Sequence, residues 1–174
     1  MIKKNLILHG KEDLDFSKGI FIFTDGAVRT DSTRPLGFRG GVGVVLYIDG
    51  KEVLTYRLAN DNTTISRMEM TGILLGLKLA HKNKFTDKVN IVCDSQFAVK
   101  GFAEWLEGWK NNGWVTYNKT AVKNMDLWKY IDETMSVMDL DVNFIWIKGH
   151  NGNIGNERAD VLATEAVETT NEQQ

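Results

Sequence analysis

The sequence predicts an α/β fold in which a mixed sheet of five strands is flanked by helices. Short apolar runs of strand length alternate along the chain with longer segments of helical periodicity. The pair Asp49-Gly50 separates two strand-like runs and indicates a hairpin. A long helical segment then joins the third and fourth strands, as in a right-handed crossover between parallel strands. The length of 174 residues suits a single domain.

The first third of the chain supplies three strands. Residues 1–18 are expected to form a short, weakly structured N-terminal extension with at most a short strand at 6–8. The first strand covers residues 19–24 and is followed by a loop, residues 25–41, that contains glycine and arginine. Residues 42–48 and 52–59 are the strands of the hairpin, and a polar loop, residues 60–64, ends this part.

The remaining two thirds alternate between helices and strands. A largely buried helix is predicted at 66–83, with Ser66 as its N-cap and Glu69 at the third helical position. Strands follow at 89–93 and 142–147, and helices at 96–107, 125–138 and 154–167. Residues 109–124 have an irregular pattern, and residues 168–174 are predicted to be a flexible tail.

Composition excludes several classes of protein. The charged fraction is 25% and the net charge is −2, which is typical of a soluble globular protein. No apolar run approaches the roughly 20 residues of a membrane span, and the N-terminus lacks the features of a signal peptide. The single cysteine, Cys93, cannot form an internal disulfide, and we expect it to be a small core residue. The sequence therefore predicts a cytoplasmic protein that does not bind membranes.

Basic residues gather in two segments, although the chain as a whole is slightly acidic. Residues 109–124 contain no acid but include Lys110, Lys119 and Lys123. The loop after Asp25 carries Arg29, Arg34 and Arg39 against a single acid, Asp31. Two local basic surfaces indicate a restricted contact with an anionic partner, and not a protein that is basic all over.

Four carboxylates occupy positions that favour a metal site. Asp25 and Asp94 end the first and fourth strands, Glu69 lies in the first turn of the crossover helix, and Asp160 lies early in the last helix. Because parallel strands end at one edge of a sheet, these side chains can converge there. Four ionised carboxylates at close range repel one another unless cations intervene. Two divalent ions about 4 Å apart would turn them into a site for hydrolysis of a phosphate ester.

Each of these residues, taken alone, also has a purely structural interpretation. Asp25 could be a turn residue, Glu69 a capping-box acid and Asp94 an N-cap. Asp160 could form an ion pair, and His150 could be an exposed loop residue. The joint pattern favours the catalytic interpretation over these separate ones.

The motifs around these residues resemble type 1 ribonuclease H. They are Thr24-Asp25-Gly26-Ala27, Arg67-Met68-Glu69, Cys93-Asp94-Ser95-Gln96, Lys148-Gly149-His150-Asn151-Gly152 and Asn156-Glu157-Arg158-Ala159-Asp160. Their order and spacing agree with the family from about residue 20 to 166. Residues 105–128 resemble the basic protrusion of that family, called the handle.

The resemblance implies a ribonuclease H-like fold, with a catalytic domain at 19–167, and cleavage of the RNA strand of an RNA–DNA hybrid. The products would carry 5′-phosphate and 3′-hydroxyl ends. Asp25, Glu69, Asp94 and Asp160 would bind two Mg²⁺ ions, with Mn²⁺ as a possible substitute. His150, on a flexible loop, would help to activate water or assist product release. We expect a monomer whose partner is the hybrid.

The handle and the start of the crossover helix are expected to contact the substrate. Tryptophan spacing in the handle favours packing of its helices by Trp105, Trp109 and Trp128, whereas Trp114 follows a glycine in a polar loop and favours surface contact. Lysines neutralise phosphates, and aromatic faces pack on sugars or bases. The expected substrate contacts are Thr64, Ser66, Arg67, Gln96, Trp105, Trp109, Lys110, Trp114, Lys119 and Lys123.

Three departures from the family pattern affect this substrate contact. Ile65 and Ser66 stand where the family commonly has asparagines that contact the minor groove, and Gly108 stands where it has an asparagine for a DNA phosphate. The loop after Asp25 is also longer than usual. We therefore expect Arg29, Arg34 and Arg39 to replace some of the lost backbone contacts.

Two alternatives remain at this point. Another nuclease of the ribonuclease H-like superfamily, such as a resolvase or a transposase core, would share the acids but generally lacks the tryptophan-rich handle. A binding module that has lost catalysis would not be expected to retain all four acids and His150. An origin in a reverse transcriptase is compatible with the sequence, although nothing polymerase-like remains.

Overall fold

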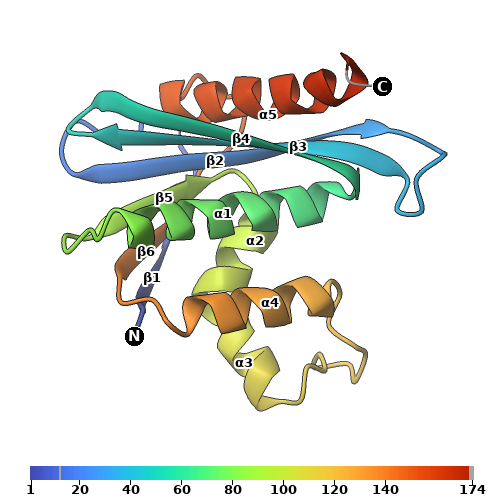
Figure 1. Cartoon of the computed structure of the whole chain (residues 1–174). Coiled ribbons are helices and arrows are strands. Elements are labelled where there is room, and N and C mark those ends of the chain that lie inside the picture. Colours follow the sequence, from blue (N-terminus) through green and yellow to red (C-terminus); the bar gives the residue numbers. More distant parts are fainter. Residues whose placement is uncertain (12, 173–174) are drawn as a thin grey trace.

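A six-stranded mixed sheet forms the centre of the molecule, with helices on both faces (Figure 1). The computed structural model describes residues 1–11 and 13–172. The strand order is β1-β6-β5-β2-β3-β4. The strands are β1 (Lys3–Leu8), β2 (Ile20–Thr30), β3 (Phe38–Ile48), β4 (Lys51–Thr63), β5 (Val89–Cys93) and β6 (Asp141–Trp146).

The sheet confirms the predicted α/β class and crossover but has one strand more than expected. Residues 3–8 form a full strand that pairs in parallel with β6, so the N-terminal extension belongs to the sheet. β2 pairs in parallel with β5 and antiparallel with β3. The Asp49-Gly50 turn joins β3 and β4, with φ of 49° and 78° at its two residues. The proposed division into an extension and a domain at 19–167 stays a prediction.

The segment expected to be a loop after Asp25 is mostly strand. β2 continues to Thr30 and β3 begins at Phe38, so only residues 31–37 turn. The paired register runs without interruption from Ile20↔Ile48 to Thr30↔Phe38. This part of the hairpin was predicted as a loop because its arginines and glycines do not indicate a strand by themselves. Arg29 and Arg39 therefore lie on paired strands, and Arg34 lies in the turn between them.

All described helices but the last lie on one face of the sheet, below it in Figure 1. They are α1 (Ile65–Lys82), α2 (Gln96–Lys100), a π-helical segment (Gly101–Trp105), α3 (Leu106–Asn111) and α4 (Met125–Met135). α5 (Ile154–Glu172) covers the other face, and it extends through residues 168–172, which were expected to belong to the tail. Residues 173–174 of that tail lie outside the described residues. No helix in the described chain is long and apolar enough to cross a membrane.

Two apolar cores hold these layers together. The larger lies between the sheet, α1 and the handle, and includes Ile22, Leu77 and the fully buried Trp128. The smaller lies under α5 and includes Phe23 and Leu162. Burying each large side chain contributes about 1.5–3 kcal/mol. The two cores fix α1 and α5, and with them Glu69 and Asp160, relative to β2.

Candidate active site

Three of the predicted carboxylates converge where β5 ends beside β2. The β2–β5 pairing stops at Thr24↔Cys93, so Asp25 and Asp94 are the next residues on neighbouring strands. Asp25 therefore lies within β2 and not at its end, because only its parallel partner stops there. The acidic oxygens of Glu69 and Asp94 and the Cys93 sulfur lie within 4.8 Å of one another.

Glycine at position 26 brings α1 close to the cluster. A Cβ at Gly26 would lie 2.8 Å from Cβ of Met68 and 2.9 Å from the Glu69 nitrogen, so only glycine allows this approach. The N-cap of α1 is Thr64, whose hydroxyl accepts a hydrogen bond from the Arg67 amide at 3.3 Å. The expectation that Ser66 caps this helix was therefore wrong. With the cap at Thr64, Glu69 is also too far along the helix to close a capping box.

The environment of the three acids opposes their ionisation. Asp25 and Glu69 are 4% and 7% exposed. Burial, followed by repulsion from Glu69 and Asp94, raises the pKa of Asp25 to about 10. Burial, followed by repulsion from Asp94, raises the pKa of Glu69 to about 8. The pKa of Asp94 is also raised, mainly by burial.

No lysine or arginine among the described residues forms an ion pair with Asp25, Glu69 or Asp94. Carboxylates buried in this way need another source of positive charge. Their oxygens are the hard ligands that Mg²⁺ and Mn²⁺ prefer. The donor set therefore fits divalent cations of this kind.

Asp160 and His150 lie at the side of this cluster where Asp94 is found. Asp160 is half-buried on α5, and its charge opposes the ionisation of Asp94. His150 is exposed in the loop between β6 and α5, at a left-handed φ of 59°, and its charge favours ionised Asp94. A Cβ at Gly149 would lie 2.6 Å from Oδ2 of Asp94, so this loop passes directly over the carboxylate.

Two contacts to Asp94 were missed by reasoning from the sequence. Nδ2 of Asn156 donates to Asp94 Oδ2 at 3.4 Å, and Nε1 of Trp146 donates to the Asp94 carbonyl at 3.0 Å. Asn156 precedes Asp160 by four residues and so shares its helix face, which was an available signal. No pattern in the sequence pointed to Trp146. The structural interpretation of Asp94 as an N-cap is wrong, because Ser95 caps α2.

Some of the predicted substrate contacts are exposed, and others already pack on or pair with other side chains. Gln96, Lys119 and Lys123 are exposed, and Trp105 is 37% exposed. Trp105 packs on Trp109 at 5.8 Å between ring centroids, and Trp109 packs on the buried Trp128 at 5.3 Å, both with tilted rings, which confirms their packing role.

Trp114 is only half-buried and belongs partly to the core. Its ring centroid lies 5.7 Å from the Lys129 nitrogen. The surface contact expected of Trp114 is therefore confined to part of its ring.

Several of the expected basic contacts already have acidic partners. Lys110 pairs with Asp132 at 3.3 Å. Arg67 forms a two-point ion pair with Asp126, with both N···O distances at 3.0 Å. The three hairpin arginines are paired as well: Arg29 with Glu168 at 3.3 Å, Arg34 with Asp31 at 3.4 Å, and Arg39 with Asp31 at 3.0 Å.

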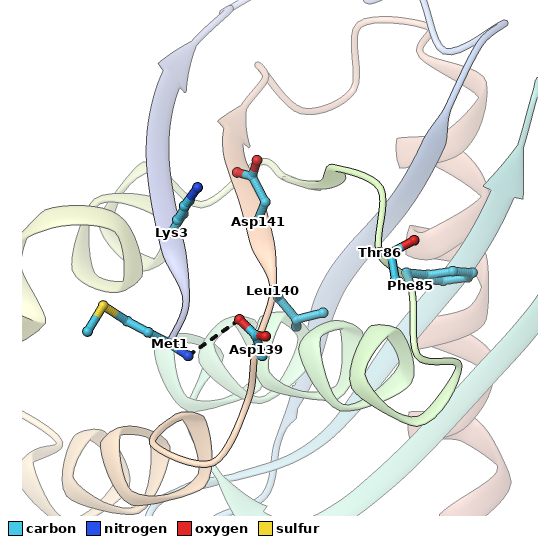
Figure 2. A pocket seen from close by; sticks show the side chains of 7 residues that line it. All are labelled: Met1, Lys3, Phe85, Thr86, Asp139, Leu140 and Asp141. Atoms are coloured by element: carbon cyan, nitrogen blue, oxygen red, sulfur yellow. Dashed lines mark hydrogen bonds and ion pairs between the residues drawn. The ribbon is translucent and has the colours of Figure 1, made fainter.

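A separate cavity of about 310 Å³ lies at the opposite ends of the parallel strands (Figure 2). Lys3 and Asp141 at the starts of β1 and β6 line it, together with Met1, Phe85, Thr86, Asp139 and Leu140. The Met1 ammonium and Asp139 face each other at 3.5 Å, and both are almost fully exposed. Open α/β sheets bind ligands at the carboxyl ends of their strands, so this cavity is not the active site.

Comparison with known proteins supports the same family as the motifs. The family model for RNase H matches residues 17–168. A ribonuclease H of Wolbachia pipientis wMel is 39% identical over 150 residues, covering 86% of this chain and 96% of its own length. A ribonuclease H of Pseudomonas savastanoi pv. phaseolicola is 40% identical over 152 residues, covering 87% of this chain and 95% of its own.

Solved structures show the same fold. The crystal structure of LC11-RNase H1 in complex with RNA/DNA hybrid has a TM-score of 0.64 and 20% identity to this chain, and covers 87% of it and 98% of that chain. The family match favours ribonuclease H over the resolvase and transposase alternatives. The chain therefore belongs to the ribonuclease H family of enzymes.

Proposed function

We propose that this enzyme hydrolyses the RNA strand of RNA–DNA hybrids with two bound Mg²⁺ ions and leaves 5′-phosphate and 3′-hydroxyl ends. The observation that carries the proposal is the convergence of Asp25, Glu69 and Asp94, which form no ion pair with a basic residue in the part of the chain that the structure describes. The solved complex of a ribonuclease H1 with an RNA/DNA hybrid supports the choice of substrate. Monomeric state and a cytoplasmic location complete the proposal.

Asp25, Glu69, Asp94 and Asp160 would hold the cations. When bound, two divalent ions polarise the phosphate and lower the pKa of an attacking water. Asn156 restrains one oxygen of Asp94 and leaves the other available. His150 is exposed on its loop, so its imidazole can exchange protons with solvent beside the reacting phosphate.

The handle would hold the DNA strand. Trp105 offers an exposed ring that is backed by Trp109 and Trp128, and Lys119 and Lys123 can neutralise phosphates. Thr64, Ser66, Arg67 and Gln96 lie at the starts of α1 and α2, beside the acids. Lys110 and Arg67 would have to exchange an acidic partner for a phosphate.

Asn124 can compensate for the loss of an amide at Gly108. It adopts a left-handed φ of 60° just before α4, and its Nδ2 atom is buried without a hydrogen-bond partner. An unpaired buried amide costs about 1–3 kcal/mol, so the Asn124 side chain would recover this cost by turning outward to a phosphate oxygen. Asn124 lies two residues before Asp126, the partner of Arg67. We therefore add Asn124 to the residues that contact a DNA phosphate.

The hairpin arginines would contribute less to hybrid binding than their number indicates. Asp31 neutralises one charge of the pair Arg34 and Arg39, and Glu168 faces Arg29. Reversing all three charges should weaken hybrid binding and flatten its dependence on salt. Unchanged affinity and salt slope would show that this hairpin is only a solvated surface.

A cleavage assay tests the proposal directly. A labelled RNA–DNA hybrid is compared with single-stranded RNA, double-stranded RNA and duplex DNA, each in Mg²⁺, Mn²⁺ and EDTA. We expect cutting of the RNA in the hybrid alone, only with metal, and with products that carry 5′-phosphates. Asp25→Asn should abolish cutting while the circular dichroism spectrum is unchanged. Cleavage in EDTA, or equal cleavage of single-stranded RNA, would contradict the proposal.

A further inference from the structure

The N-terminal strand lies outside the range of the family match and yet touches the residue that supports Asp94. The match begins at residue 17, whereas β1 covers Lys3–Leu8. β1 pairs with β6 as far as Leu8↔Trp146. The amides of His9 and Gly10 both donate to the Trp146 carbonyl, at 3.0 and 3.1 Å. The residues that follow the N-terminal strand are therefore held to Trp146 by two hydrogen bonds.

Gly10 also lies against the indole ring of Trp146. A Cβ added at Gly10 would lie 3.2 Å from Cζ3 of Trp146 and 3.9 Å from two further ring atoms. Gly10 has a φ of +68°, a conformation that favours glycine. Because a larger residue would push on the ring, the position of the indole depends on glycine at this site.

The other edge of the same indole supports Asp94. Nε1 of Trp146 donates to the Asp94 carbonyl at 3.0 Å, across the pairing of Cys93 with Trp146. This hydrogen bond fixes the backbone between β5 and α2, from which the Asp94 carboxylate projects. A continuous set of contacts thus leads from Gly10 through Trp146 to Asp94.

We propose that residues 3–10 are a built-in support of the active site and that Trp146 is a positioning residue for Asp94. The proposal rests on the proposed function in one respect, that Asp94 binds metal. Metal–ligand distances lie within about 0.2 Å of their standard values, so a movement of this backbone that lengthens them weakens binding. Loss of a group that orients a ligand typically lowers metal affinity by about 10–100-fold.

Trp146→Phe removes the donor and keeps an aromatic ring in the core. We expect the Mg²⁺ affinity measured by calorimetry to fall by about tenfold. The value of kcat at limiting Mg²⁺ should fall with it, whereas KM for the hybrid should not change, because the handle is untouched. A purely structural role for Trp146 would lower the melting temperature and leave Mg²⁺ affinity as in wild type.

Gly10→Ala tests the N-terminal support, and Gly19→Ala is its matched control. Gly19 also has a positive φ, of +90°, but a Cβ there would meet no atom within 4 Å. Both variants therefore carry backbone strain, and only one of them presses on Trp146. In ¹⁵N spectra the Trp146 indole resonance is identified by its absence in Trp146→Phe. Gly10→Ala should shift it, speed its exchange with solvent and weaken Mg²⁺ binding, whereas Gly19→Ala should not.

These measurements distinguish a failure of this inference from a failure of the proposed function. An inactive wild-type protein would contradict the proposed function, while the indole exchange and Mg²⁺ titrations would still decide the inference. If Gly10→Ala does not fold, the Mg²⁺ affinity of Trp146→Phe decides it. The inference is overturned if Gly10→Ala matches Gly19→Ala in both readouts, or if Trp146→Phe binds Mg²⁺ as tightly as wild type.

Discussion

Single acidic residues of the candidate site are buried together at the expense of stability. Burial and mutual repulsion raise the pKa of Asp25 to about 10 and that of Glu69 to about 8, against about 4 in an unfolded chain. Without metal, the folded state therefore holds protons that the unfolded state releases. Its stability must fall as pH rises between these values.

Asp25→Asn should stabilise the metal-free protein, and more so at higher pH. Asparagine is neutral in both the folded and the unfolded chain, so the variant avoids the cost of keeping Asp25 protonated in the fold, a cost that grows as pH rises. We expect the gain in unfolding free energy at pH 7.5 to exceed the gain at pH 5 by about 1–3 kcal/mol, measured by urea unfolding in EDTA. Saturating Mg²⁺ should shrink the gain, because only wild type keeps the full set of ligands. Equal gains at both pH values would show that Asp25 is not protonated in the metal-free fold.

Cys93 has a second role besides filling the core. Its buried thiol donates to Oε2 of Glu69 at 3.4 Å and accepts from the Ser95 amide at 3.4 Å. Cys93→Ser keeps a donor, whereas Cys93→Ala removes it. Both should lower stability by about 1 kcal/mol, but only the alanine variant should also need several-fold more Mg²⁺ for half-maximal activity. Identical Mg²⁺ requirements for the two variants would leave Cys93 a packing residue alone.

At the scale of elements, the close approach of α5 to the sheet brings Asp160 to the site. A Cβ at Gly43 would lie 2.1 Å from the Ala159 carbonyl, and one at Gly41 would lie 2.3 Å from the Ala163 carbonyl. These glycines on β3 let the helix backbone lie on the strand backbone. The sequence showed the glycines, but not that a helix more than 100 residues later would rest on them.

Gly43→Ala should displace α5 and weaken both fold and activity. We expect a loss of about 1–3 kcal/mol in unfolding free energy, as for other overpacked cores, together with a lower kcat from the shift of Asp160. Gly108→Ala is the control, because a Cβ there meets nothing within 4 Å in the helix α3. The unfolding free energy of that control should rise by about 0.5–1 kcal/mol, because alanine favours a helix more than glycine does. An active, fully stable Gly43→Ala would mean that α5 can move without moving Asp160.

The existence of most elements could be predicted from the sequence, whereas their ends depended on tertiary partners. The strand at 89–93 is confirmed at both ends, because a short apolar run bounded by polar residues has few alternatives. β2 and β3 extend into residues that favour loops because each strand supplies the hydrogen bonds of the other. β1 was mostly missed, since its exposed edge position requires no alternation of apolar residues. The acids at the site could be predicted, but the contacts of Trp146 with Asp94 and Gly10 exist only in three dimensions.

At the scale of the whole molecule, acids slightly outnumber basic residues, and several of the basic residues expected at the substrate are paired. The net charge is −2, and Lys110, Arg67 and the hairpin arginines already face acids. The handle lies on the α1 face of the sheet, and the turn between β2 and β3 projects beyond it at the right of Figure 1. A hybrid that contacts both would meet few lysines without an acidic partner.

The salt dependence of hybrid binding should therefore be shallow. Each neutralised phosphate contributes about −0.7 to −0.9 to the slope of log affinity against log salt concentration. With Lys119, Lys123 and one net charge at Asp31 as the main contributors, we expect a slope of about −2 to −4. Fluorescence anisotropy with Asp25→Asn, in Ca²⁺ to prevent cutting, measures it between 50 and 200 mM salt. Lys119→Gln with Lys123→Gln should reduce the slope by about 1.5, whereas Lys51→Gln with Lys88→Gln, outside the proposed contacts, should not. A slope steeper than about −6 in the Asp25→Asn protein would contradict this count and mean that further basic residues, such as Lys129 or the paired arginines, also bind phosphates.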